Sequence, residues 1–325
     1  MAASLDGSIM RDALADVGPN DAVIPDREPT DAAVACLPRR WPERPSAGGR
    51  EGLRRSYALR DLVLDGDLVS VGYDLDGECT ENRATSVCRQ DGITAFVADG
   101  ADGVDNAFGV HILPVVRDFV PDLEAQVQGR MAGGETLVVR LADWSGTRND
   151  VDFFFSISEA LSIGEPRWDA RDSYVLDEDA FLEDETPRIA DAAAYVADGV
   201  VVGRIPDRQP ITLPWVDGSK ISLPLLSGRF TAELSADLSR LERAVIQGRI
   251  STFDIRRMWD DAGFCEGTDA RRALDAALQR ALDGLINEGV GGDPFCDTIS
   301  IALEFRGERI GEVERDAIDR AGQCE

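Results

Sequence analysis

Histidine and lysine are almost absent from this chain of 325 residues, which has only His111 and Lys220. A catalytic cysteine or a serine triad needs a base, and His111 is the only imidazole available. We interpret it as a structural residue on the apolar face of a predicted helix. There is no Gly-x-Ser-x-Gly elbow, and the glycines of 289–292 follow a predicted helix instead of a strand. The sequence therefore does not support a triad hydrolase, a thiol enzyme or a phosphate-binding loop.

Long apolar runs and positive charge are also scarce. No window approaches the roughly 18 uninterrupted apolar residues that a membrane helix needs, so we expect no transmembrane segment. The N-terminus shows no apolar stretch after a basic one, so no secretory signal is visible. The 34 basic residues face 61 acidic ones, for a net charge of -27. A field this negative repels phosphate, which argues against a nucleic-acid partner.

The composition that remains is typical of a folded protein. Hydrophobic residues make up 43% of the chain and charged residues 29%, which is enough to bury a sizeable core and excludes wholesale disorder. We expect residues 1–50 to form a flexible acidic tail or linker. Residues 51–325 would then form a β-rich globular domain, and the acidic, poorly periodic stretch at 165–190 is a candidate division within it.

The acidic surface has two explanations, export of a protein from a GC-rich genome or salt adaptation of a cytosolic one. The six cysteines favour export, because their number is even and their spacing fits no close metal motif. From spacing we expect a local Cys79–Cys88 disulfide, a Cys265–Cys296 disulfide around a helix and a Cys36–Cys324 disulfide between the ends. Free buried thiols are the alternative.

Short β-type runs between Gly and Asp turns begin after residue 56 and dominate the chain. The predicted strands are 57–64, 68–73, 136–141, 151–158, 194–196, 200–205, 211–213, 221–225, 230–236, 244–250 and 298–305. The Asp198-Gly199 pair predicts a tight hairpin turn. Helices are expected over 105–130, kinked at Pro114 and Pro121, and over 252–262 and 268–287. We therefore predict a mainly β fold with helices, an antiparallel β-sandwich or jelly-roll-like body of about eleven strands plus three helices.

Two Asp-Gly stretches, 73–79 and 99–106, form the densest group of candidate ligands. Alternating Asp and Gly lets a loop fold back so that several oxygens converge, which is what calcium requires. The pattern is not an EF-hand, because no Glu stands at the twelfth position of either stretch. The alternative interpretation is plain Asp-Gly turns with a helix N-cap. The candidate metal ligands are Asp74, Asp76, Asp99, Asp102, Asp105 and Asn106.

A third acidic loop suggests a sugar site. It joins two predicted strands and contains Trp144, Asn149 and Asp150. An exposed indole ring can stack on a pyranose while the amide and carboxylate bind hydroxyls. The alternative is that Trp144 covers the edge of the core.

Four blocks, DGADGVDNAFG at 99–109, VVRLADWSGTRND at 138–150, AYVADG at 194–199 and IQGRI at 246–250, resemble uncharacterised secreted or lipid-anchored proteins of GC-rich Gram-negative bacteria. The Asp-, Ala- and Pro-rich residues 12–35 resemble the spacer that follows the lipid-anchored cysteine in such proteins. The resemblance implies an extracellular or cell-envelope location and no particular activity.

Our leading hypothesis is an exported, non-enzymatic cell-envelope protein with a binding or structural role, stabilised by calcium. A glycan or an envelope protein is the candidate partner. The first alternative is a secreted polysaccharide hydrolase that uses paired carboxylates, although 61 acidic residues leave no pair singled out. The second is a salt-adapted cytosolic domain with free thiols.

Overall fold

The computed structural model describes residues 36–49, 52–64, 67–81, 86–90, 97–287, 294–311 and 313–316. Most of the predicted tail therefore lies outside the described residues. The part of it that is described, 36–49, contacts the folded body. Arg44 pairs with Asp152 at 2.6 Å, and the Tyr195 hydroxyl donates a hydrogen bond to the Pro42 carbonyl at 2.7 Å.

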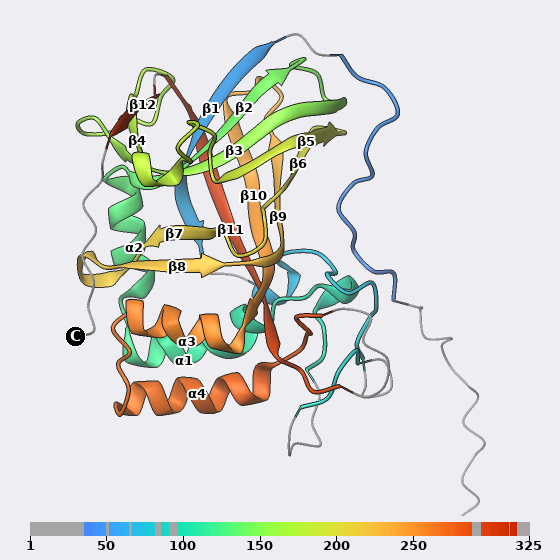
Figure 1. Ribbon diagram of the computed structural model, residues 1–325, viewed down its shortest axis with the longest axis vertical. Helices are drawn as coiled ribbons and strands as arrows, with labels where there is room; N and C mark the ends of the chain where they lie inside the picture. The colour runs from blue at the N-terminus through green and yellow to red at the C-terminus, as the bar shows by residue number, and fades with distance from the viewer. Residues whose placement is uncertain are drawn as a thin grey trace, which may run out of the picture. The chain divides into compact units, whose positions relative to one another are not determined.

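Eight of the described strands form a closed antiparallel β-barrel (Figure 1). In order around the barrel they are β3 (Asp150–Ser162), β2 (Glu135–Trp144), β1 (Leu53–Val63), β11 (Thr298–Ile310), β10 (Arg240–Ser251), β9 (Leu226–Leu234), β6 (Val200–Arg204) and β5 (Ile189–Ala197). Pairing of β5 with β3 closes the ring. The mainly β prediction is confirmed, but the predicted sandwich or jelly-roll-like body is wrong.

The closure of the barrel depends on β3. One edge of this 13-residue strand pairs with β2, while the other pairs first with β5 and then with β4 (Tyr174–Asp177). The β3–β5 register shifts twice, around Phe153, and such irregularities bend a strand. Alternation along one strand predicts a buried face in a sandwich and in a barrel alike, so it could not tell the two apart.

The remaining described strands lie outside the barrel. β12 (Val313–Asp316) pairs in parallel with β4 and extends the sheet beyond β3. β7 (Pro210–Pro214) and β8 (Lys220–Pro224) form a separate two-stranded sheet that contacts β2 and helix α3 (Thr252–Asp261). The stretch 165–190, a candidate division, contains β4 and belongs to the same compact unit as the barrel.

Strand β11 shows how the sequence specifies the core. Ile299, Ile301, Leu303 and Phe305 are buried in the main hydrophobic cluster, whereas Ser300 and Ala302 alternate with them on the opposite, outer face of the barrel. The period of two is that of a strand with one buried face. Small side chains on the outer face of β11 leave room for loops to pack there.

The described residues contain four α-helices, α1 (Leu113–Phe119), α2 (Leu123–Ala132), α3 and α4 (Asp269–Ala281). The helix predicted over 105–130 is divided, because Pro114 begins α1 after a π-helical turn and the break before α2 contains Pro121. The predicted helices at 252–262 and 268–287 are confirmed. Their N-caps are Ser251 and Thr268, whose hydroxyls accept from backbone N–H groups. α4 ends earlier than predicted, since Gly284 already pairs with β11.

Two local predictions have different outcomes. The Asp198-Gly199 turn is confirmed: it joins β5 to β6, and both residues have positive φ, 52° and 87°. The strand predicted over 68–73 is wrong, because Leu68–Ser70 form a 3-10 turn and the residues after it are irregular.

The disulfides between described cysteines are Cys36–Cys79 and Cys88–Cys296. The predicted Cys79–Cys88, Cys265–Cys296 and Cys36–Cys324 disulfides are therefore wrong. Cys265 is also disulfide-bonded, and its partner lies outside the described residues. Proximity along the chain was a poor guide, because the loop around Cys79 packs against the segment that begins at Cys36.

Candidate metal centre

Two loops, 71–81 and 97–107, cover the outer face of β10 and β11. The Asn106 side chain connects one loop to the barrel, since its Oδ1 accepts from the N–H of Ala302 at 3.0 Å. The N–H of Ala107 donates to the Ser300 hydroxyl at 2.8 Å. In the other loop, Gly72 has φ +111°, and a Cβ there would lie 2.8 Å from the Ala302 Cβ. The outer face of the barrel thus fixes both Asp-Gly loops in place.

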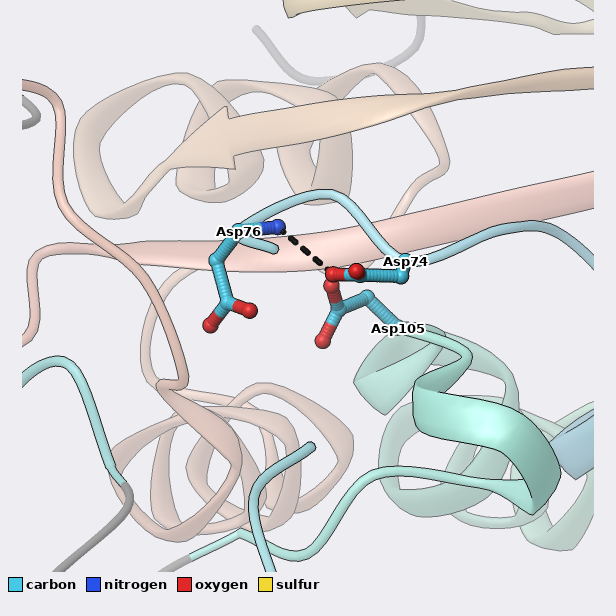
Figure 2. A group of neighbouring side chains, drawn as sticks. All are labelled: Asp74, Asp76 and Asp105. Atoms are coloured by element: carbon cyan, nitrogen blue, oxygen red, sulfur yellow. Dashed lines mark hydrogen bonds between the residues drawn. The ribbon is translucent and has the colours of Figure 1, made fainter. Parts of the chain in front are cut away.

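These loops bring together three carboxylates, those of Asp74, Asp76 and Asp105. One oxygen from each lies within 4.8 Å of the others. Figure 2 shows the Asp74 and Asp105 carboxylates next to each other, with that of Asp76 facing them. Asp74 and Asp105 are only 3% and 6% exposed. Among the described residues this is the group whose geometry could hold a metal ion.

Backbone N–H groups orient the three side chains. Asp74 Oδ1 accepts from the N–H groups of Asp76, at 3.1 Å, and Gly77, at 2.6 Å. Asp105 Oδ2 accepts from the Leu75 N–H at 2.6 Å. The Asp74 contacts are local Asx-type turns, whereas the Asp105 contact joins the two loops. They set the direction of the carboxylates before any ion arrives.

One oxygen in the group has no partner. Asp74 Oδ2 is buried and makes no hydrogen bond among the described residues. Leaving a buried acceptor unsatisfied costs about 1–3 kcal/mol, and more when the group is charged. A cation at this point would satisfy the oxygen. This unmade interaction distinguishes the cluster from an ordinary set of Asp-Gly turns.

Burial raises the pKa of the carboxyl groups here. Desolvation, with the charges of Asp99 and Asp74 adding to it, raises the pKa of Asp76 to about 7. Desolvation also raises the pKa of Asp99 to about 6, and that of Asp105 well above its usual value. A divalent cation would favour the ionised forms that burial and mutual repulsion disfavour.

Asp283 is a member of this acidic group that the sequence did not reveal. It follows α4, its Oδ1 accepts from the Ser300 N–H at 2.8 Å, and its negative charge raises the pKa of Asp105. The basic neighbour is Arg249 of β10, whose positive charge partly offsets the desolvation that raises the pKa values of Asp283 and Asp76. A Cβ at Gly284 would lie 2.9 Å from the Arg249 Cδ, so glycine is required beside it. Carboxylates outnumber cations at the site.

The other predicted metal ligands have separate roles. Asp99 lies beside the triad, where it interacts with Asp105 and its Oδ2 accepts from the Thr80 N–H at 2.6 Å. Asp102 is 57% exposed and pairs with Arg39 at 3.4 Å. Asn106 uses its amide on backbone groups, including the Leu68 carbonyl at 3.0 Å. The structure therefore brings Asp74, Asp76, Asp99 and Asp105 together, and leaves Asp102 and Asn106 outside the oxygen cluster.

The predicted sugar site is arranged differently from the expectation. Trp144 is 0% exposed, and its Nε1–H donates to the Thr147 carbonyl, so its ring is not available for stacking on a sugar. Asp150 is also buried and accepts from the Ser145 N–H. Asn149 Oδ1 accepts from the Asp198 N–H at 2.9 Å. The expectation of an exposed indole is wrong because Trp144 belongs to the core.

No family model, curated protein or solved structure matches the chain. The chemistry of the site is therefore argued from its own residues. An all-oxygen carboxylate set suits hard cations such as calcium or magnesium, and it lacks the sulfur or imidazole ligands that zinc and copper prefer. The disulfides indicate an oxidising, extracellular or envelope location. Within the described part of the chain, no helix has the length and apolar character to cross a membrane.

Proposed function

We propose that this protein is an exported, non-enzymatic barrel of the cell envelope that binds calcium at Asp74, Asp76 and Asp105. The ion stabilises the two loops on the outer face of β10 and β11. Its role is binding or structural, in keeping with the resemblance to secreted and lipid-anchored proteins. The observation that carries the proposal is the buried Asp74 Oδ2, which has no hydrogen-bond partner among the described residues and belongs to a carboxylate triad.

Two further observations support calcium over a mere cluster of acids. Several carboxyl groups here have raised pKa values, so the ion-free site is under strain that a divalent cation relieves. Cys79 lies in the same loop as Asp74 and Asp76, and its disulfide with Cys36 fixes that loop covalently. A loop that is covalently fixed loses less conformational entropy when it orders around an ion.

The proposal is tested by calorimetric titration of the full, non-reduced chain with calcium and with magnesium, and by thermal unfolding in EGTA and in millimolar calcium. We expect one calcium site and a rise in melting temperature, because the ion binds the native state alone. Asp74→Asn and Asp105→Asn should abolish that rise. Asp102→Asn is the matched control, since Asp102 lies in the same loop but pairs with Arg39. A full calcium response in both buried-site variants would refute the proposal.

A secreted polysaccharide hydrolase is the second candidate. Asp76, whose pKa is raised to about 7, lies beside other carboxylates, and a protonated acid next to a carboxylate is what glycoside hydrolysis requires. Release of reducing ends from a panel of polysaccharides separates the two ideas. The first proposal, a non-enzymatic calcium-binding barrel, predicts that the wild type releases no reducing ends. Turnover that Asp76→Asn eliminates and calcium inhibits would favour the hydrolase.

A further inference from the structure

A group of arginines without acidic partners lies on another part of the barrel. A hollow of about 400 Å³ is lined by Arg54 of β1 and Arg140 of β2, and by no described carboxylate. Arg55 and Arg309 also border it, but they lie on the Tyr57 side of the sheet, opposite Arg140. None of the four arginines makes an ion pair with a carboxylate of the described residues. In a chain with 61 acidic residues and 34 basic ones, arginines that gather away from acids need an explanation.

Arg140 is the centre of this arginine hollow. In the barrel it lies opposite Ser56 of β1 on one side and opposite Ser156 of β3 on the other. Its pKa is lowered by burial and by the positive charges of Arg54 and Arg315. Guanidinium keeps its proton at any physiological pH, so the site cannot relieve this repulsion by losing charge. A bound anion would relieve it.

Ser156 provides an independent sign of a missing ligand. It lines the same hollow, is 0% exposed, and its hydroxyl has no hydrogen-bond partner among the described residues. A buried hydroxyl without a partner is unfavourable, because it has lost its hydrogen bonds to water and made none in their place. Because Ser156 and Arg140 are cross-strand partners, one group placed between them could accept from both.

Part of the wall of the hollow is apolar. Phe154 and Val313 line it, and both also line an adjoining hollow of about 370 Å³ that shares Arg140. On the far side of the second hollow, Arg315 lies over the Phe181 ring at 4.9 Å and pairs with Glu185 at 3.1 Å. Charged hydrogen-bond donors at one end and apolar walls beside them are the usual layout of a small-molecule site.

We propose that the arginine hollow binds a small organic anion through its phosphate, sulfate or carboxylate group. Arg140 and Arg54 hold the oxyanion, the Ser156 hydroxyl donates to it, and the apolar part of the ligand lies against Phe154 and Val313. The arginine fork matches the oxygens of these anions. The net charge of -27 does not prevent binding, because at 0.1 M salt exposed charges beyond about 10 Å are largely screened.

The test is calorimetric titration of the full chain in EGTA, so that it does not depend on the calcium site. The probes are phenyl phosphate, inorganic phosphate, inorganic sulfate, acetate and, as the uncharged control, phenol. We expect one site for phenyl phosphate, weaker binding of the inorganic ions and acetate, and none of phenol. Arg140→Gln should weaken binding about tenfold or more, since a hydrogen bond to a charged group is lost. Arg257→Gln on α3 makes the same charge change away from the hollow and should alter affinity less than about twofold.

If Arg140→Gln fails to fold, Arg54→Gln provides the second test. Because Arg54 is exposed, its replacement should weaken anion binding without changing the melting temperature. Failure of all four anions to bind at millimolar concentration would overturn the proposal. An equal loss of affinity in Arg257→Gln would also overturn it, because the effect would then be one of overall charge.

Discussion

The acidic centre and the arginine hollow are two clusters of like charge on one barrel. They reduce the electrostatic repulsion within each cluster in different ways. Desolvation raises the pKa values of Asp76, Asp99 and Asp105, so near neutral pH these carboxyl groups can give up charge by taking protons. Arginine has no such option, since its guanidinium keeps its proton at any physiological pH. The arginine side chains instead line a hollow, where they stay charged next to a space large enough for a ligand. Under the two proposals, the same kind of repulsion makes the acidic site depend on protons or a cation and the arginine site depend on an anion.

The largest test of this contrast removes the Cys36–Cys79 disulfide, because Cys79 belongs to the acidic loop and neither cysteine lines the arginine hollow. The double variant Cys36→Ala, Cys79→Ala should lose about 2–4 kcal/mol in free energy of unfolding. It should also lose most of the calcium-induced rise in melting temperature, because the loop that holds Asp74 and Asp76 is freed. Phenyl phosphate titration is the internal control and should be unchanged. Equal damage to both sites would show that they are not independent.

The next test uses pH. In EGTA, Asp76 and Asp99 keep protons in the native state up to about pH 7 and about pH 6, whereas in the unfolded chain their pKa is near 3.8. The native state therefore holds more protons between these values, and stability should fall as pH rises from 5 to 8. The slope is about 1.4 kcal/mol per pH unit for each such proton. Urea unfolding at several pH values measures it.

Calcium and two variants sharpen the pH test. Saturating calcium should flatten or reverse the slope, since the ion favours the ionised carboxylates. Asp76→Asn should reduce the slope, and Arg140→Gln should leave it unchanged because guanidinium does not titrate in this range. A flat profile in EGTA for the wild type would mean that the carboxyl groups of the acidic centre are not destabilised by burial.

The smallest expected effect comes from replacing Ser156. Its Oγ, like Asp74 Oδ2, is buried and has no hydrogen-bond partner among the described residues. Without ligand, Ser156→Ala should raise the free energy of unfolding by up to about 1 kcal/mol, because it removes a buried hydroxyl that makes no hydrogen bond. The same variant should bind phenyl phosphate less tightly. Urea unfolding and titration measure the two effects. A marked loss of stability would show that Ser156 has a structural partner and would weaken the case for the anion.

Part of the fold and of the metal centre could be read from local pattern. Strand alternation such as that of β11, the Asp198-Gly199 turn and the starts of α3 and α4 are properties of a few neighbouring residues, and they were predicted well. The Asp-Gly spacing named Asp74, Asp76 and Asp105. The turns that orient Asp74 and Asp76 are local, whereas Asp105 is held by the Leu75 N–H of the other loop.

What could not be predicted depends on contacts between distant parts of the chain. Barrel closure rests on the pairing of β3 with β5, and the partner of Cys79 lies 43 residues away from it. Asp283 joins the acidic centre from the far end of α4, with no motif to mark it. Arg140 looked like any other arginine in a strand, because its isolation from acids exists only in three dimensions. Trp144 was expected to be exposed, and its burial likewise depends on packing in three dimensions.

The disulfides also determine how the protein would respond to mechanical tension. Seven of the eight barrel strands lie within a stretch of chain closed by Cys36–Cys79 or Cys88–Cys296, and β11 alone lies outside both. A force applied beyond Cys36 and Cys296 would pass across the two sulfur bridges and bypass those seven strands. Stretching in an optical trap should therefore release little length until the protein is reduced. Tethered at its ends, this barrel would behave as a short and nearly inextensible link.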